Sequence, residues 1–128
     1  MIVVDASAVI EALIGEPNDA LACRLVGEAV LHAPHLLDTE VLHVLRRMEQ
    51  RGNLTADRAS AARQLFGELA IDRYPHHQLS DRVWQLRPGL SAHDATHVAL
   101  AEALDATLVT TDQRLAGAAG VRAAIEIH

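Results

Sequence analysis

Short apolar runs alternate along the chain with longer segments in which apolar residues recur every three or four positions. The runs are typical of buried strands, and the spaced segments are typical of helices with one apolar face. Strands are predicted at residues 2–4, 29–33, 71–74, 107–110 and 123–127. Helices are predicted at residues 9–14, 19–28, 35–51, 56–69, 79–87, 91–104 and 112–117. This order predicts an α/β protein in which three layers (α/β/α) surround a mainly parallel sheet of four to five strands.

Capping and breaking residues set the ends of several of these helices. We expect Asn18, Thr55 and Ser91 to cap the helices that follow them, because their side chains can accept a hydrogen bond from a free backbone N–H. Pro34 suits the first turn of a helix, where its missing N–H has no cost. Gly52 is expected to end the longest helix.

The composition indicates one hydrophobic core. The chain has 128 residues, which predicts a single domain over residues 1–128. Half of the residues are hydrophobic but only 2% are aromatic, so Ala, Leu, Val and Ile build the core; Cys23, Leu65 and Trp84 are expected to face inward. No apolar run approaches the roughly 20 residues of a membrane span, and Met1 leads directly into a strand. We therefore expect a cytoplasmic protein without membrane contact.

The charge of the chain restricts its chemistry. A formal net charge of −6 argues against a protein that holds nucleic acid through its overall charge. All 11 basic residues are arginines, which bind phosphate in a bidentate manner. The absence of lysine excludes lysine Schiff bases and a phosphate-loop lysine. It also argues against a phosphoacceptor signalling domain, which clusters aspartates around Mg²⁺ but needs a lysine.

Four acidic residues occupy equivalent places in the predicted layout. Asp5 and Asp112 follow strands, Asp94 lies in the first turn of a helix, and Glu40 lies early in the helix at 35–51. In a parallel sheet these places meet at the carboxyl ends of the strands. Oxygen ligands without histidines or cysteines at metal-binding spacing select Mg²⁺ or Mn²⁺ over zinc.

Helix capping is the alternative explanation for these acids. Asp5 and Asp112 lie at capping positions, and Ser91 with Asp94 matches a capping box, each contributing about 1 kcal/mol. Glu40 is not explained in this way. It lies about one turn into its helix beside the apolar stripe, where a carboxylate needs a partner. For Ser7, a hydroxyl of the cap region and a group that holds a metal-bound water both remain open.

Four stretches together resemble the PIN domain and, within it, the VapC-type toxins of bacterial toxin–antitoxin pairs. They are MIVVDASAVI, HLLDTEVLHVLRR, LSAHDATHVALAEALDATLVTTDQRL and the closing strand. The resemblance rests on the joint order of D-x-S, E-V, D-A-x-x-V-A-L-A and T-x-D. It implies an endoribonuclease toxin that hydrolyses RNA phosphodiester bonds with a water activated by Mg²⁺ or Mn²⁺. It also implies a cognate antitoxin that blocks the site, and a homodimer. A non-catalytic interaction module of the same fold is the alternative.

The resemblance assigns roles to individual residues. It implies that the catalytic, metal-binding set is Asp5, Glu40, Asp94 and Asp112, with Ser7 and Thr111 as hydroxyl auxiliaries. Apart from the resemblance, arginines could form a local positive rim on this acidic protein. The candidate RNA contacts are Arg46, Arg47 and Arg51 on the long helix, followed by Arg73, Arg82, Arg87 and Arg114, and for each an ordinary surface arginine is the alternative. His93 and His97 stand where these helices often carry tyrosines. Because no H-E-x-x-H pattern accompanies them, we expect packing or RNA stacking rather than zinc binding.

Overall fold

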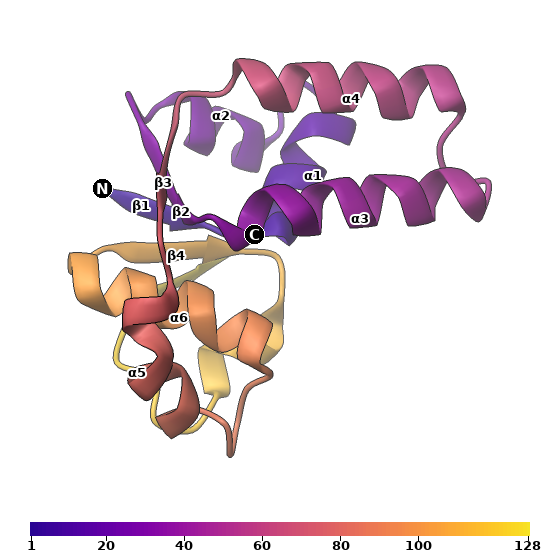
Figure 1. Cartoon of the computed structure of the whole chain (residues 1–128). Helices are drawn as coiled ribbons and strands as arrows, with labels where there is room; N and C mark the ends of the chain where they lie inside the picture. The colour runs from indigo at the N-terminus through magenta and orange to yellow at the C-terminus, as the bar shows by residue number, and fades with distance from the viewer.

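The computed structural model describes residues 1–128 and is built around a five-stranded sheet between two layers of helices (Figure 1). All four strand pairings are parallel, in the order β3-β2-β1-β4-β5. The strands are β1 (Ile2–Val4), β2 (Leu31–Pro34), β3 (Ile71–Tyr74), β4 (Thr107–Thr110) and β5 (Ile125–Ile127). The predicted three-layer α/β/α fold is confirmed, with the larger of the two expected strand numbers.

The helices divide between the two faces of the sheet. One face packs against α1 (Ala6–Ile14), α2 (Ala20–Val26), α3 (Leu36–Gln50) and α4 (Ala56–Glu68). The other face packs against α5 (Ser80–Gln85), α6 (Ala92–Leu104) and the short 3₁₀ helices η1 (His77–Leu79) and η2 (Gln113–Gly117). Figure 1 shows α3 and α4 as a long pair that extends beyond the sheet.

Successive residues of the inner strands enter different cores. Ile2 and Val4 lie in the core beneath α1 to α4, whereas Val3 lies in the core beneath α5 and α6. In β4, Val109 and Leu108 divide in the same way. Side chains alternate along a strand, and both faces here are covered, so consecutive residues of these strands are apolar. This explains why unbroken apolar runs marked them in the sequence.

Several element boundaries differ from the prediction by a few residues, and two of the differences concern expected capping or helix-starting residues. Pro34 is the last residue of β2 and does not begin a helix. Pairing with β3 continues past the proline, because the next residue, His35, donates its N–H to the carbonyl of Tyr74 at 2.9 Å. Asp19, not Asn18, caps α2, because its carboxylate accepts a backbone N–H one turn into the helix at 2.7 Å.

Three side chains expected to face inward are exposed. Cys23 lies on the outer side of α2, Leu65 is 48% exposed on α4, and Trp84 is 66% exposed on α5. These helices pack through narrower faces than the apolar pattern indicated. The Trp84 ring is covered on one side by the guanidinium of Arg87, 4.3 Å from its centroid. None of the helices combines the length and apolarity that crossing a membrane requires.

An ion pair joins α5 to α6 and to the chain that follows η2. Arg82 donates to both carboxylate oxygens of Glu102, at 2.6 and 3.0 Å, and to the carbonyl of Gly120 at 2.6 Å. The N–H of Arg122 donates to the same carboxylate at 2.8 Å. Burial acts to raise the pKa of Glu102, but the hydrogen bonds from Arg82 and Arg122 outweigh it and lower that pKa. Because Arg82 binds both oxygens of the Glu102 carboxylate, this ion pair is a strong contact between α5 and α6.

Replacing Glu102 should therefore have a pH-dependent cost. We expect Glu102→Gln to lower the free energy of unfolding by about 1–3 kcal/mol at neutral pH, because a charge-assisted hydrogen bond is removed. The folded-state pKa lies below the unfolded value of about 4.3, so this stabilisation is present above that pH and disappears as the pH falls through the folded pKa. Urea unfolding across this range should show the two proteins converging in acid. Glu49→Gln, at an exposed site without a partner, is the control; a deficit of Glu102→Gln that stays constant with pH would contradict the assignment.

Candidate active site

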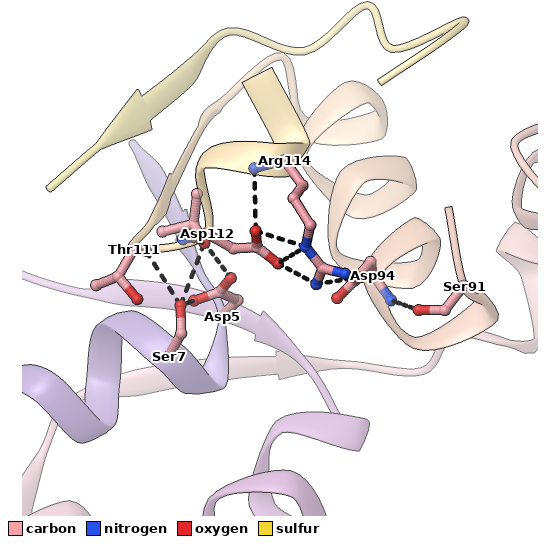
Figure 2. A network of polar contacts seen from close by, with 8 residues as sticks. Asp5, Ser7, Ser91, Asp94, Thr111, Asp112 and Arg114 are labelled. Atoms are coloured by element: carbon pink, nitrogen blue, oxygen red, sulfur yellow. Dashed lines mark hydrogen bonds and ion pairs between the residues drawn. The ribbon is translucent and has the colours of Figure 1, made fainter. Parts of the chain in front are cut away.

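The candidate site lies at the switch point of the sheet, where the strand order changes direction between β1 and β4. From β1 the chain proceeds to β2 and β3 on one side, and later to β4 and β5 on the other. The carboxyl ends of β1 and β4 therefore border a crevice of the kind in which α/β proteins bind ligands. Asp5 directly follows β1, and Asp112 follows β4 (Figure 2). A short loop joins α6 to β4, so α6 runs back along the strand and brings Asp94 in its first turn to the same edge.

Asp5 is the most firmly held of the four acids. It is 8% exposed, and its Oδ1 accepts the N–H of Ala8 at 2.9 Å and the hydroxyl of Ser7 at 2.7 Å. Its Oδ2 accepts the hydroxyl of Thr110, the last residue of β4. The capping role predicted for Asp5 is confirmed. The same carboxylate also joins the end of β1 to the end of β4.

The hydroxyl groups around Asp5 differ in part from those expected. Ser7 lies within 3.2 Å of the Thr110 hydroxyl and accepts the N–H of Thr111 at 3.1 Å. Thr111 contributes this N–H, while its own hydroxyl forms no hydrogen bond within the protein. Sequence reasoning missed Thr110 because it counted the residue among the buried positions of a strand. A hydroxyl that ends an otherwise apolar strand beside an acidic turn was the available signal.

Arg114 links Asp112 with Asp94 (Figure 2). Asp112 caps η2 by accepting the N–H of Arg114 at 3.0 Å, and its carboxylate also binds the guanidinium, with Nε at 2.9 Å from Oδ1 and Nη2 at 2.5 Å from Oδ2. The same Nη2 lies 3.9 Å from Oδ2 of Asp94. The hydrogen bond from Arg114 lowers the pKa of Asp112. Asp94 donates its N–H to the hydroxyl of Ser91 at 3.2 Å, which is one half of the predicted capping box.

Glu40 has the partner that its position required. Its Oε1 lies 2.6 Å from Nε2 of His97 on α6, and the side chains are 22% and 2% exposed, respectively. His97 is packed in the interior as expected, but its contact with Glu40 was not foreseen, because 57 residues separate the two. His93, one turn earlier on α6, is exposed and borders a pocket of about 330 Å³ together with Leu36 and Trp84.

Of the three leading arginine candidates for RNA contacts, Arg46 and Arg47 lie in the second half of α3, and Arg51 is the residue that follows its end. Arg46, Arg47 and Arg51 are exposed, and their side chains form no hydrogen bond or ion pair. By contrast, Arg73 is bound to Asp38 in the first turn of α3 by two hydrogen bonds, at 2.7 and 2.9 Å. The guanidinium groups of Arg46, Arg47 and Arg51 are therefore free for another ligand, whereas that of Arg73 is not.

The donor chemistry of the acidic edge suits a divalent cation, but the donors are not closed around one point. Four carboxylates are the oxygen ligands that Mg²⁺ and Mn²⁺ prefer. No group of three or more metal-binding side chains is close enough together to hold an ion. Each of the four acids already has a partner within the protein. Arg114 contacts Asp112 and Asp94, and His97 contacts Glu40. Asp5 accepts the hydrogen bonds described above.

Comparison with known proteins identifies the class. The family model described as PIN domain matches residues 2–121, so the chain belongs to the PIN domain family. The solved structure of VapBC2 from Rickettsia felis, bound to a DNA fragment from its promoter, has the same fold, with a TM-score of 0.74, 13% identity and coverage of 99% of this chain and 98% of that chain.

Relatives place the chain more narrowly. Ribonuclease VapC9 of Mycobacterium tuberculosis is 50% identical over 115 residues, which cover 90% of this chain and 88% of the relative. Ribonuclease VapC1 of the same organism is 44% identical over 127 residues, 98% of this chain and 96% of the relative. Within the PIN domain family the chain is therefore a VapC-type endoribonuclease, which confirms the resemblance and sets aside the phosphoacceptor alternative. Ribonucleases of this kind generally depend on a divalent metal.

The role of the Thr110 hydroxyl group can be tested with a variant that keeps the shape of the side chain. We expect Thr110→Val, which keeps the branched side chain, to lower the free energy of unfolding by about 1–3 kcal/mol, because the buried Asp5 carboxylate loses a donor. RNA cleavage should fall with it, and Thr110→Ser should recover both. Thr107→Val, in the same strand at a position without a side-chain hydrogen bond, is the control for urea unfolding and cleavage. Indistinguishable Thr110→Val and Thr107→Val proteins would show that Asp5 does not depend on this hydroxyl.

Proposed function

We propose that the chain, acting as one PIN-like domain over residues 1–128, is a toxin that cuts RNA with Mg²⁺, for which Mn²⁺ can substitute. Asp5, Glu40, Asp94 and Asp112 are the proposed ligands and catalytic set. One observation carries this proposal: the acids lie directly after β1, near the start of α3, in the first turn of α6 and after β4, and these are positions at the carboxyl edge of one parallel sheet. The ribonuclease relatives make RNA the substrate that this edge would serve.

The side chains of the site prepare it for phosphate chemistry. A bound divalent ion neutralises the scissile phosphate and activates the attacking water. Ser7 and Thr110 fix the orientation of the Asp5 carboxylate. Arg114 keeps Asp112 ionised by lowering its pKa. The hydroxyl of Thr111 has no partner in the protein, and we propose that it contacts the substrate or a water molecule as an auxiliary group.

Free arginines on α3 offset the negative net charge locally. Arg47 and Arg51 lie seven and eleven residues after Glu40, close to two and three helical turns, so all three share one side of α3. At about 1.5 Å per residue they lie roughly 10 and 16 Å from Glu40 along the helix axis. We propose that they and the neighbouring Arg46 hold the RNA backbone while the acidic edge cuts it.

Three further assignments accompany the ribonuclease function. We infer a cognate antitoxin protein that blocks the acidic edge, which is favoured by a PIN-fold neighbour solved as a VapBC pair. We also infer a homodimer, because Trp84 is 66% exposed on α5 and borders an apolar pocket with Leu36 and Val83. Exposed aromatic surface of this kind is typical of interfaces. We place the protein in the cytoplasm, where a toxin meets cellular RNA.

Neutralising a proposed ligand should remove cleavage without unfolding the protein. We expect Asp5→Asn and Asp94→Asn to reduce Mg²⁺-dependent cleavage at least about 100-fold, because even residues that only support metal ligands change activity about 10–100-fold. Circular dichroism should show an unchanged fold. Mg²⁺ should raise the melting temperature of the original protein more than that of Asp94→Asn, since an ion that binds the folded state stabilises it.

The assay uses a broad RNA pool, with the 5′ ends of the products sequenced to locate the cuts. Asp72→Asn, at an exposed position of β3 without a partner, should cleave normally. Full activity of Asp5→Asn or Asp94→Asn would overturn the assignment. A wild-type protein that cuts nothing with either Mg²⁺ or Mn²⁺ would favour the non-catalytic interaction module.

The arginines of α3 predict a salt-dependent RNA interaction. In the Asp94→Asn background, we expect Arg47→Gln with Arg51→Gln to weaken RNA binding. The slope of log K against log salt should become shallower by about 0.7 for each phosphate that the protein no longer neutralises. Fluorescence anisotropy with a labelled single-stranded RNA measures both quantities. Arg122→Gln, which removes one exposed guanidinium remote from α3, is the control. Equal slopes for all proteins would show that these arginines are ordinary surface residues.

A further inference from the structure

We infer that His97 is a positioning residue for Glu40, and that it holds this carboxylate in the orientation in which Glu40 contributes to metal binding. The inference rests on the proposed function, because it assumes that Glu40 belongs to the acidic set. Nε2 of His97 lies 2.6 Å from Oε1 of Glu40. Glu40 comes from the helix layer on one face of the sheet and His97 from the layer on the other, so the contact joins the two layers.

The chemistry of the pair fixes the direction of the hydrogen bond. An ionised carboxylate can only accept, so Nε2 of His97 carries the proton and donates it. The other ring nitrogen, Nδ1, is buried and has no hydrogen-bond partner. Glu40 is therefore the only polar partner of this imidazole within the protein.

Core packing alone does not explain a histidine at this position. A buried polar atom without a partner costs about 1–3 kcal/mol, and an apolar side chain would fill the same space without that cost. The neighbouring buried positions of α6 are filled in this way, by Ala95, Val98 and Ala101. What the imidazole adds to packing is a donor directed at Glu40.

The donor matters because Glu40 is flexible and partly exposed. A glutamate has three rotatable bonds, and 22% of this side chain is exposed, so without His97 the carboxylate can turn into solvent. Groups that orient a metal ligand typically change metal affinity or activity about 10–100-fold when they are removed. We therefore assign to His97 an effect on metal affinity that operates through Glu40.

Two amide variants separate donation from packing. The amide nitrogen of glutamine can occupy the place of the ring Nε2, whereas that of asparagine extends only as far as Nδ1. We expect His97→Asn to weaken Mn²⁺ binding about 10-fold or more, and His97→Gln to recover most of the loss. Mn²⁺ dissociation constants are measured on the protein without RNA, by electron paramagnetic resonance of the free ion, and RNA cleavage is measured at saturating Mn²⁺.

A double-mutant cycle tests whether His97 acts through Glu40. In the Glu40→Gln background, His97→Asn should cause no further loss of Mn²⁺ affinity. Thermal unfolding confirms that each variant is folded. If His97→Asn does not fold, His97→Phe takes its place, because it keeps a packed ring, removes the unpartnered Nδ1 and should bind Mn²⁺ as weakly as expected for His97→Asn.

The outcomes distinguish this inference from the function on which it rests. A wild-type protein that neither binds Mn²⁺ nor cuts RNA would overturn the proposed function, and the role of His97 with it. A functional wild-type protein with unchanged Mn²⁺ affinity in His97→Asn or His97→Phe would overturn the inference alone. Equal losses in the asparagine and glutamine variants, or a further loss in the Glu40→Gln background, would assign His97 a packing role only.

Discussion

The buried carboxylate of Asp5 is the constraint on which the arrangement of the site depends. A charged group at 8% exposure must be fully hydrogen bonded, and its donors come from the first turn of α1 and from the end of β4. β1 lies between β2 and β4, so this carboxylate joins the ends of two adjacent central strands that are far apart in the sequence. The same carboxylate thus caps α1 and holds the ends of β1 and β4 together at the candidate site.

Much of the layout was predictable because a covered parallel sheet leaves a clear record in the sequence. Its strands are buried on both faces, so β1 is an unbroken apolar run and β4 has the adjacent apolar residues Leu108 and Val109. An acid one or two residues after such a strand falls on the carboxyl edge. The capping residue of α2 was predicted one position too early, at Asn18 instead of Asp19. Asn18 and Asp19 are both good caps, and only the backbone conformation shows which one accepts the N–H.

Contacts between distant segments were not predictable in the same way. Glu40 required a partner, but a single sequence contains no distance information, so His97 remained one of eight histidines. The exposure of individual apolar side chains on the helices was also difficult to infer from the sequence. Trp84 and Leu65 follow the helical period of their neighbours, yet they lie outside the narrow contact faces of α5 and α4. Periodicity defines a stripe, whereas its buried width depends on what packs against it.

Arg114 has a consequence for the thermodynamics of ion uptake at the acidic edge. Its guanidinium already balances the charge of Asp112 and lies 3.9 Å from Asp94. A divalent ion bound by these carboxylates, as proposed, would therefore exchange with an internal counterion and would not simply add to an unbalanced cluster. The apparent affinity of the edge would then reflect the difference between two cations competing for the same oxygens. The tethered cation is 81% exposed, so its release requires no opening of the core.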